Sequence, residues 1–411
     1  MDSITPNHPN NGRSHESSNG FNGHHSSNGH SSNGHSSNGH STNGHSTNGH
    51  QNGVHEILDR QNGLAPVAPN PGQRILVAGG AGYIGSILVP RLVERGYRVR
   101  VLDRLYFGDD GLASVSDDIE LVVADVRDIP DSAFDGVDGV INLSGLSNDP
   151  TAEFNPQANW QMNAIATENL GRQCVSRGIE RYIFASSCSL YDGLPPGMHA
   201  EDAPVEPRAA YATSKRYGEE RLLELVDDGL CPVILRNGTV YGWSPRMRFD
   251  LVVNTFVKDA LLGGALKLHG GGWMWRPLVD IRDCAEAMIA CYEAPSHKVR
   301  GEIFNVVHSN YQIRELAMIV AGSVQLAGRA ATLEEVPGLK LNRNYECANA
   351  KLSTTLGFIP RRSVLEAVTD MLSRLDPDDR VALTDPRAYN IRWLELLHAV
   401  KPTVESFASV L

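Results

Sequence analysis

A glycine-rich stretch constrains the fold of this chain more than any other feature of its sequence. Residues 74–85 read Arg-Ile-Leu-Val-Ala-Gly-Gly-Ala-Gly-Tyr-Ile-Gly, which predicts a short buried strand, a tight turn and the start of a helix toward Glu94. Gly79, Gly82 and Gly85 have the spacing that lets the backbone approach a pyrophosphate and lets the helix pack against the strand. The phosphates would bind the free N–H groups at the helix N-terminus.

A second predicted strand, residues 98–103, follows the helix and ends on the carboxylate of Asp103. Asp103 lies 18 positions after Gly85, close to the spacing of an acid that binds the ribose hydroxyls of adenosine. This context favours a dinucleotide site over a plain structural turn followed by a solvated Asp. The carboxylate also favours NAD over NADP because it repels a 2′-phosphate, although the neighbouring Arg104 weakens that preference.

The rest of the chain alternates between predicted strands and helices. Continuous apolar segments occur at residues 119–125, 139–145, 181–187 and 231–236, a pattern typical of a parallel sheet covered on both faces. We therefore predict an α/β fold with a Rossmann-type doubly wound parallel sheet. The expected limits are an NAD-binding Rossmann domain over 73–245 and a smaller C-terminal substrate-binding region over 246–411, partly interleaved with the sheet at about 279–307.

Residues 1–72 form a tail rich in Asn, Gly, Ser and His that cannot bury an apolar core. We predict that this tail is disordered. Its repeated histidines could bind nickel or zinc weakly, but a solvated spacer is favoured because a flexible array loses entropy with every ligand it recruits. No metal site is predicted in the chain.

Composition limits the possible partners. The net charge of −11 argues against a broad surface for nucleic acid or for an anionic membrane, because both are bound through neutralisation of phosphates. The six cysteines are scattered without zinc spacing, as expected of cytosolic thiols. No apolar run has the length of a transmembrane helix. We expect a soluble, cytoplasmic protein.

The candidate chemistry lies on a predicted helix that starts near Ala210 and contains Tyr211-Ala-Thr-Ser-Lys215. This spacing puts Tyr211 and Lys215 on one helix face. A phenol, with a pKa of about 10, is a poor base at neutral pH unless a cation lies beside it, and Lys215 could supply that charge. Ser187, at the end of a predicted strand, would hydrogen-bond the substrate oxygen. The alternative is a half-buried Tyr and an extended Lys on an ordinary amphipathic helix.

Taken together, these motifs resemble the extended short-chain dehydrogenase/reductase family, in its nucleotide-sugar epimerase and dehydratase group. The resemblance runs from about Arg74 to Val307, which is more than half of the chain. The matching segments are Gly79–Gly85, Asp103, Asp125–Val126, Leu143–Gly145, Ser186–Ser187 ahead of Tyr191, Tyr211–Lys215, Arg236, Val240–Gly242, Arg276 and Val279–Asp280.

The resemblance implies roles for several of these residues. Tyr211 would be the catalytic acid/base, assisted by Ser187 and Lys215, and Arg276 would contact the substrate diphosphate, unless it forms only a surface salt bridge. Ser187 would also touch the substrate, and Thr239, just before the matching Val240–Gly242, is a further candidate for substrate binding. A homodimer through helices at about 158–175 and 211–226 is implied as well. The implied NAD-binding residues are Gly79, Gly82, Tyr83, Ile84, Gly85, Asp103, Asp125, Val126, Leu143, Ser144, Gly145, Tyr211 and Lys215.

Three positions depart from patterns common in the family. Sugar 4,6-dehydratases usually carry an Asp-Glu pair directly after the catalytic Ser or Thr, and related decarboxylases tend to keep a Glu there. This chain has Cys188 and Ser189, which disfavours both reactions. We interpret Cys188 as a small packing residue rather than a catalytic thiol. Thr239 stands where 4-epimerases often have an Asn, which puts the usual contact to the sugar nucleotide in doubt.

The sequence thus predicts an NAD-dependent epimerase of a nucleotide-activated sugar, working by transient oxidation to a keto intermediate. Its partner would be a nucleotide-sugar substrate. Two other interpretations stay open. One is an NAD(P)-dependent reductase or dehydrogenase of a keto sugar or other secondary alcohol, and the other is a non-catalytic dinucleotide-binding sensor or scaffold.

Overall fold

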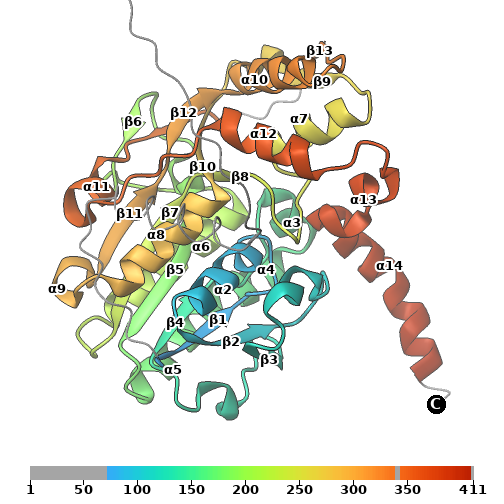
Figure 1. The fold of residues 1–411 in the computed structure, drawn as a ribbon. Helices are drawn as coiled ribbons and strands as arrows, with labels where there is room; N and C mark the ends of the chain where they lie inside the picture. Colours follow the sequence, from blue (N-terminus) through green and yellow to red (C-terminus); the bar gives the residue numbers. More distant parts are fainter. Residues whose placement is uncertain (1–71, 338–342, 409–411) are drawn as a thin grey trace, which may run out of the picture. The chain divides into compact units, whose positions relative to one another are not determined.

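The computed structural model describes residues 72–337 and 343–408, and its centre is a seven-stranded parallel sheet (Figure 1). Apart from Gly72, the tail predicted to be disordered lies outside the described residues. The strands of the sheet, in chain order, are β1 (Arg74–Ala78), β2 (Arg98–Asp103), β3 (Ile119–Val123), β4 (Gly139–Asn142), β5 (Arg181–Ser187), β7 (Cys231–Asn237) and β11 (Glu302–Val306).

The strand order across the sheet is β11-β7-β5-β4-β1-β2-β3, and every neighbouring pair is parallel. The chain therefore winds outward in both directions from β1 and β4, which confirms the predicted Rossmann-type doubly wound sheet. In such sheets a ligand binds at the carboxyl ends of the strands, where the winding reverses. That point lies here between β1 and β4.

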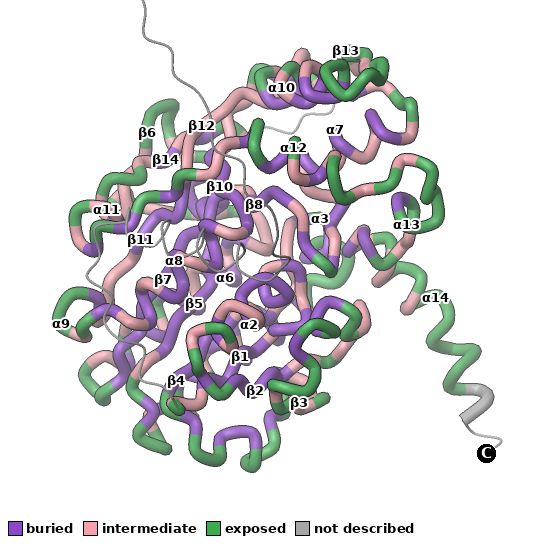
Figure 2. The backbone as a smooth tube through the Cα atoms, in the orientation of Figure 1, coloured by how far each residue is buried: buried purple, intermediate pink, exposed green. Residues whose placement is uncertain are grey.

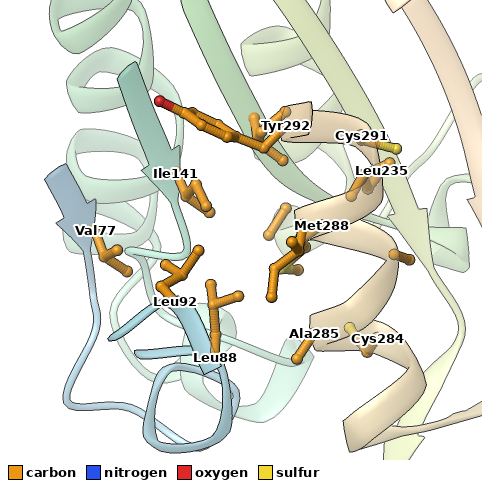
Figure 3. Close-up of a cluster of buried hydrophobic side chains, with 14 of the residues drawn as sticks. Val77, Leu88, Leu92, Ile141, Leu235, Cys284, Ala285, Met288, Cys291 and Tyr292 are labelled. Carbon is orange, nitrogen blue, oxygen red and sulfur yellow. The ribbon is translucent and has the colours of Figure 1, made fainter. Parts of the chain in front are cut away.

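Both faces of the sheet are buried along its central strands because these carry apolar side chains on both sides, whereas Leu121 and Val123 of the edge strand β3 are exposed. In β1, Ile75 and Val77 pack on one face with helices α2 (Gly85–Glu94) and α8 (Ile281–Glu293), as Figure 3 shows for Val77. Leu76 and Ala78 pack on the other face with α5 (Ala166–Ser176) and α6 (Ala210–Glu224). Figure 2 shows the same pattern as continuous burial along the central strands.

Two predicted elements have different limits in the structure. The helix predicted at about 158–175 lies in a longer helical stretch that is divided into α4 (Pro156–Asn159), a π-helical segment η3 (Trp160–Ile165) and α5. The π-helical segment carries Asn163, whose side-chain amide bonds both backbone groups of Leu146. β3 ends at Val123 rather than at Asp125, because the Asp125 carboxylate accepts the backbone N–H of Arg127 in a tight turn.

A smaller cluster of buried apolar residues lies outside the main sheet and includes residues of α7, α10 and α12. Val279 and Asp280 belong to a three-stranded sheet in this part, and the chain then returns to the main sheet at β11. The domain limits given above stay predictions. The remaining strands are β6 (Met198–His199), β8 (Thr239–Tyr241), β9 (Leu266–His269), β10 (Trp275–Asp280), β12 (Ser309–Gln312), β13 (Leu333–Val336) and β14 (Glu346–Cys347).

The other helical elements connect these strands or cover their edges. The α-helices are α3 (Asp149–Phe154), α7 (Val252–Leu261), α9 (Ser296–Val299), α10 (Ile313–Leu326), α11 (Ala350–Leu356), α12 (Val364–Arg374), α13 (Arg380–Thr384) and α14 (Asn390–Ala408). Short 3₁₀ turns are η1 (Asp110–Val115), η2 (Asp131–Phe134), η4 (Cys188–Tyr191), η5 (Gly270–Gly272) and η6 (Pro386–Ala388). Among the described helices, none is long and apolar enough to cross a membrane.

A buried ion pair supports the strand that carries Ser187. Arg236 of β7 and Glu219 of α6 are joined by an Nη2–Oε2 distance of 2.7 Å, and both side chains are 4% exposed. Arg236 also donates to the Tyr191 hydroxyl at 2.9 Å. Removal of one partner would leave the other charge buried without compensation.

We therefore expect Arg236→Ala to lower the free energy of unfolding by about 3–5 kcal/mol. Lys401→Ala is the control, because the Lys401–Glu405 pair is exposed and should contribute less than about 1 kcal/mol. Urea unfolding of both variants measures the difference. Equal and small effects would show that the buried pair contributes little.

Candidate functional site

One cavity of about 970 Å³ opens at the carboxyl ends of the main strands and extends to residues of β9 and β10. Its volume is at the upper end of the range for small-molecule sites. Every residue that the sequence predicted for the site lines this cavity: Gly79, Gly82, Tyr83, Ile84, Gly85, Asp103, Asp125, Val126, Leu143, Ser144, Gly145, Ser187, Tyr211, Lys215, Thr239 and Arg276. The structure thus brings the whole set together, while their roles stay predictions.

The glycine turn lies at one end of the cavity, where two positions leave no room for a side chain. Gly79 has a φ of +78°, and a Cβ there would lie 2.8 Å from the backbone nitrogen of Ser144. A Cβ on Gly85 would lie 2.2 Å from the carbonyl oxygen of Gly80. The turn is therefore held tightly against the end of β4 and against α2.

Helix α2 begins directly after this turn and has an open N-terminus. Within the described ranges, no side chain caps α2 and its first turn contains no acidic residue. The N–H groups of Ser86 and Ile87 already donate to the carbonyl oxygens of Gly82 and Ile84, so it is the positive end of the helix dipole that suits an anionic ligand. This end of the cavity fits the diphosphate of a dinucleotide, with a glycine backbone close enough to contact it.

Asp103 ends β2 beside the glycine turn. Its carboxylate accepts the backbone N–H of Ala81 at 3.0 Å and that of Leu105 at 2.8 Å. Burial raises the pKa of Asp103, while these backbone hydrogen bonds oppose that rise. The side chain is fixed at the cavity edge, in a position suited to accept hydrogen bonds from ribose hydroxyls.

Asp125 forms ion pairs with two arginines. Arg127 donates to it at 2.9 Å and 2.6 Å, and Arg104 forms a second ion pair with it. The hydrogen bond from Arg127 is the largest of the influences that hold the pKa of Asp125 well below its usual range. Arg104 is therefore engaged by a carboxylate, which weakens its expected attraction for a 2′-phosphate and leaves the preference for NAD in place.

The predicted catalytic residues meet at the centre of the cavity. Tyr211 lies in the first turn of α6, and the hydroxyl of Ser187, the last residue of β5, acts to lower the pKa of Tyr211. Lys215 follows one turn later, with its Nζ 5.9 Å from the centre of the Tyr211 ring. This Nζ donates to the carbonyl oxygen of Ala185 at 2.9 Å. Burial lowers the pKa of Lys215 to about 8.

A second cation near Tyr211 was missed in the sequence. Burial raises the pKa of Tyr211, and the positive charge of Arg248 is the largest opposing influence. Arg248 is buried between Asp250, at 2.8 Å and 2.9 Å, and the hydroxyl of Ser147, at 2.9 Å. The only local sequence feature that could have pointed to this cation is the segment Arg-Met-Arg at 246–248. Two arginines at this spacing are not typical of any particular kind of site.

Thr239 and Arg276 lie in the part of the cavity formed by the three-stranded sheet. Thr239 begins β8, and Arg276 is the second residue of β10. Arg276 donates to the carbonyl oxygen of Trp275 at 2.7 Å, and no carboxylate of the described residues forms an ion pair with it. Burial lowers its pKa. Arg276 therefore does not form, with the described residues, the surface salt bridge that was the alternative interpretation of this residue.

Comparisons with known proteins agree with this geometry. The model of the NAD dependent epimerase/dehydratase family matches residues 75–306, more than half of the chain. The chain belongs to this family. It is 30% identical over 278 residues to a UDP-N-acetyl-alpha-D-glucosaminuronate decarboxylase of Bacillus cytotoxicus, covering 64% of this chain and 84% of that protein.

Two further relatives of the family are epimerases. The UDP-glucose 4-epimerase of Mycolicibacterium smegmatis is 28% identical over 313 residues, which cover 72% of this chain and 96% of that enzyme. The solved UDP-glucose 4-epimerase of Thermus thermophilus, in complex with NAD, is 27% identical with a TM-score of 0.64, covering 74% of this chain and 100% of that one. Members of the family similar to this chain therefore catalyse different reactions on nucleotide sugars.

The two positions after Ser187 differ in their surroundings. Cys188 is fully buried, and its thiol donates to the carbonyl oxygen of Arg236 at 3.1 Å. It is absent from the described residues that line the cavity, in agreement with a packing role. Ser189 does line the cavity, and its buried hydroxyl has no hydrogen-bond partner among the described residues.

The lowered pKa of Lys215 predicts that this lysine destabilises the protein at neutral pH. Below about pH 8 the buried side chain is charged in the folded state, which burial disfavours relative to the unfolded state. Between that pH and its ordinary pKa of 10.5 the folded state loses the proton first, and the destabilisation is relieved.

We therefore expect Lys215→Met to be more stable than the wild type by about 2 kcal/mol at pH 7, the lost bond to Ala185 offsetting part of the gain. The difference should shrink as the pH rises above 8. Urea unfolding of cofactor-free protein at pH 7 and pH 10 measures it, with Lys401→Met as the control at an exposed position. A difference that does not change with pH would contradict the prediction.

Proposed function

We propose that this chain is an NAD-dependent epimerase that inverts one carbon of a nucleotide-activated sugar. The observation that carries the proposal is the arrangement of one cavity, where Ser187, Tyr211 and Lys215 lie beside a cradle for a dinucleotide. The positions after Ser187 carry Cys188 and Ser189, so neither supplies the acid that elimination or decarboxylation commonly uses in this family.

NAD is the proposed cofactor, in line with the solved Thermus thermophilus epimerase, which is in complex with NAD. The glycine turn and the N-terminus of α2 would bind its diphosphate, and Asp103 would bind a ribose. Bound NAD supplies a hydride acceptor and donor, so that a secondary alcohol of the sugar can be oxidised and reduced again. The remaining chemistry belongs to side chains of the chain itself.

Tyr211 would move the proton. As a phenolate it would take the proton of the sugar hydroxyl, and as a phenol it would return that proton to the sugar oxygen. Burial disfavours the phenolate, so the nearby positive charges of Lys215 and Arg248 must compensate. Ser187, which lines the same cavity as Tyr211, would hold the same sugar oxygen in line for the transfer.

The substrate is proposed to be a nucleotide sugar whose diphosphate binds Arg276. The Arg276 guanidinium lacks an ion-pair partner within the described part of the chain and lies on the cavity wall. A planar guanidinium binds phosphate oxygens in a bidentate way. The decarboxylase of Bacillus cytotoxicus and the epimerase of Mycolicibacterium smegmatis are both named for UDP-activated sugars, which supports UDP as the first nucleotide to test.

Tyr211→Phe tests the catalytic proposal. We expect this variant to keep its NAD but to lose turnover by about 10²–10⁴-fold, because the ring stays in place while the proton carrier is removed. NMR of a panel of UDP-, GDP-, CDP- and dTDP-sugars measures inversion at each sugar carbon.

The same panel separates the proposed function from its rivals. Inversion without net formation of NADH supports the epimerase. Net NADH turnover would indicate a dehydrogenase or reductase, and release of carbon dioxide from a sugar acid would indicate a decarboxylase. Full biological function of Tyr211→Phe, with NAD still bound, would favour a non-catalytic sensor.

Arg276→Gln tests the substrate site separately. We expect KM for the nucleotide sugar to rise about 10-fold or more with a smaller change in kcat, because the guanidinium binds a part of the substrate that does not react. Steady-state kinetics of inversion, with NAD content checked, gives both constants. An unchanged KM would remove Arg276 from the diphosphate site.

A further inference from the structure

The segment after β8 runs alongside the glycine turn. The Tyr83 hydroxyl donates to the carbonyl oxygen of Gly242 at 2.6 Å, and the Ser244 hydroxyl donates to the carbonyl oxygen of Tyr83 at 2.9 Å. Both contacts are buried. Residues 242–248 are therefore fixed against the part of the cavity where a dinucleotide diphosphate would lie.

Arg246, in this segment, lines the cavity and is only 8% exposed. One of its terminal nitrogens donates to the side chain of Asn390 at 2.6 Å, and its guanidinium lies 3.9 Å from the centre of the Phe107 ring. Within residues 72–337 and 343–408, its Nε has no acceptor and no carboxylate forms an ion pair with it. A buried guanidinium without an anionic partner is costly unless a ligand provides one.

The charges around Arg246 do not compensate for its burial. Burial, followed by the like charge of Arg248, lowers the pKa of Arg246 to about 9. Asp250 and Asp103 oppose this, but Asp250 is already held by Arg248 in two hydrogen bonds. Arg246 is still charged at neutral pH, so this wall of the cavity carries positive charge that an anion would neutralise.

The first turn of α2 lies close to the Arg246 side chain. A Cβ placed on Gly111 would lie 3.1 Å from the Cβ of Arg246 and 2.1 Å from the hydroxyl of Ser86, so both flank the same glycine. Ser86 is the second residue of α2, whose N-terminus is uncapped within the described residues. An anion at this helix end would thus lie near both the positive end of the helix dipole and the guanidinium.

We propose that Arg246 binds the diphosphate of the dinucleotide, opposite the N-terminus of α2, and that Asn390 positions it. This proposal rests on the cofactor named under the proposed function. Arg246 would thus bring a charged side chain to the diphosphate from outside the strand–turn–helix unit. The glycine turn itself provides only backbone groups.

The C-terminal segment fixes Asn390 from several sides. The Asn390 amide nitrogen donates to the hydroxyl of Ser147 at 2.9 Å, while its oxygen accepts from Arg246. Arg387 forms an ion pair with Asp110 at 2.9 Å, and the Trp393 indole donates to the carbonyl oxygen of Tyr106. These contacts tie residues 387–393 to the loop after β2, so Asn390 acts as a positioning residue for Arg246.

The test uses the full chain stripped of cofactor and isothermal titration with two probes, NAD⁺ and ADP-ribose. ADP-ribose keeps the diphosphate but lacks the nicotinamide. We expect Arg246→Gln to weaken both by a similar factor of about 10–100, because one charge-assisted hydrogen bond is lost. Arg246→Lys should retain part of the affinity, since it keeps the charge but not the planar fork.

Two further variants separate positioning from general damage. Asn390→Ala should weaken ADP-ribose binding by less than Arg246→Gln, and Arg246→Gln combined with Asn390→Ala should add little beyond Arg246→Gln alone. Lys267→Gln, which removes a cavity cation on β9, is the matched control and should leave ADP-ribose binding unchanged. Circular dichroism and the melting temperature identify any variant that fails to fold.

Other outcomes would overturn the proposal. If Arg246→Gln bound ADP-ribose as the wild type does but bound UDP-sugars more weakly, Arg246 would serve the substrate instead. Unchanged affinity for both would leave it a purely structural residue. A wild type that bound ADP-ribose tightly yet inverted no sugar would contradict the proposed function alone, whereas one that bound no dinucleotide would overturn both proposals.

Discussion

The close contact between the glycine turn and the end of β4 is the constraint on which the rest of the site depends. Gly79 takes a left-handed conformation, and its α-carbon lies against the backbone of Ser144. Any side chain at this position would displace one of the two strands. This contact holds β1 and β4 together where the winding of the sheet reverses. The cavity opens at that point, and α2 begins there with its N-terminus free.

The site is built from buried cations whose charges are only partly balanced. Lys215 has no carboxylate close enough to form an ion pair within the described ranges, and Arg246 is in the same situation, while Arg248 is matched by Asp250. Such groups destabilise the folded chain, so we propose that Arg246 is placed for an anionic ligand and Lys215 for the phenolate of Tyr211. By contrast, the buried pair of Arg236 and Glu219 is internally balanced and supports the strand that ends in Ser187.

The sequence alone was sufficient to predict the parts of the site that lie within one short segment of the chain. The glycine spacing, the acid at the end of β2 and the i, i+4 pair of Tyr211 and Lys215 each lie within one strand–turn–helix unit or one helix turn. The alternation of apolar segments predicted a parallel, doubly wound sheet, which the structure confirms. The family resemblance contributed Arg276 and Thr239, which the structure brings to the same cavity.

Arg248, Arg246 and Asn390 could not be predicted, because their contacts join distant parts of the chain. Arg246 and Asn390 are 144 positions apart in the sequence, and neither belongs to a motif. The division of the helix predicted at about 158–175 was also missed, since it accompanies the bonds from Asn163 to Leu146 and no Gly or Pro lies within Trp160–Ile165. The predicted homodimer and the roles of the site residues stay predictions.

The central claim is that the sugar is oxidised and reduced again within one active site. The most direct measurement uses a nucleotide sugar that is deuterated on its ring carbons, incubated in ordinary water and followed by NMR and mass spectrometry. We predict that the inverted product keeps its full deuterium content, because the hydride returns to the same molecule. Loss of one deuterium to water during inversion would show that a proton exchanges at that carbon, and would contradict the account.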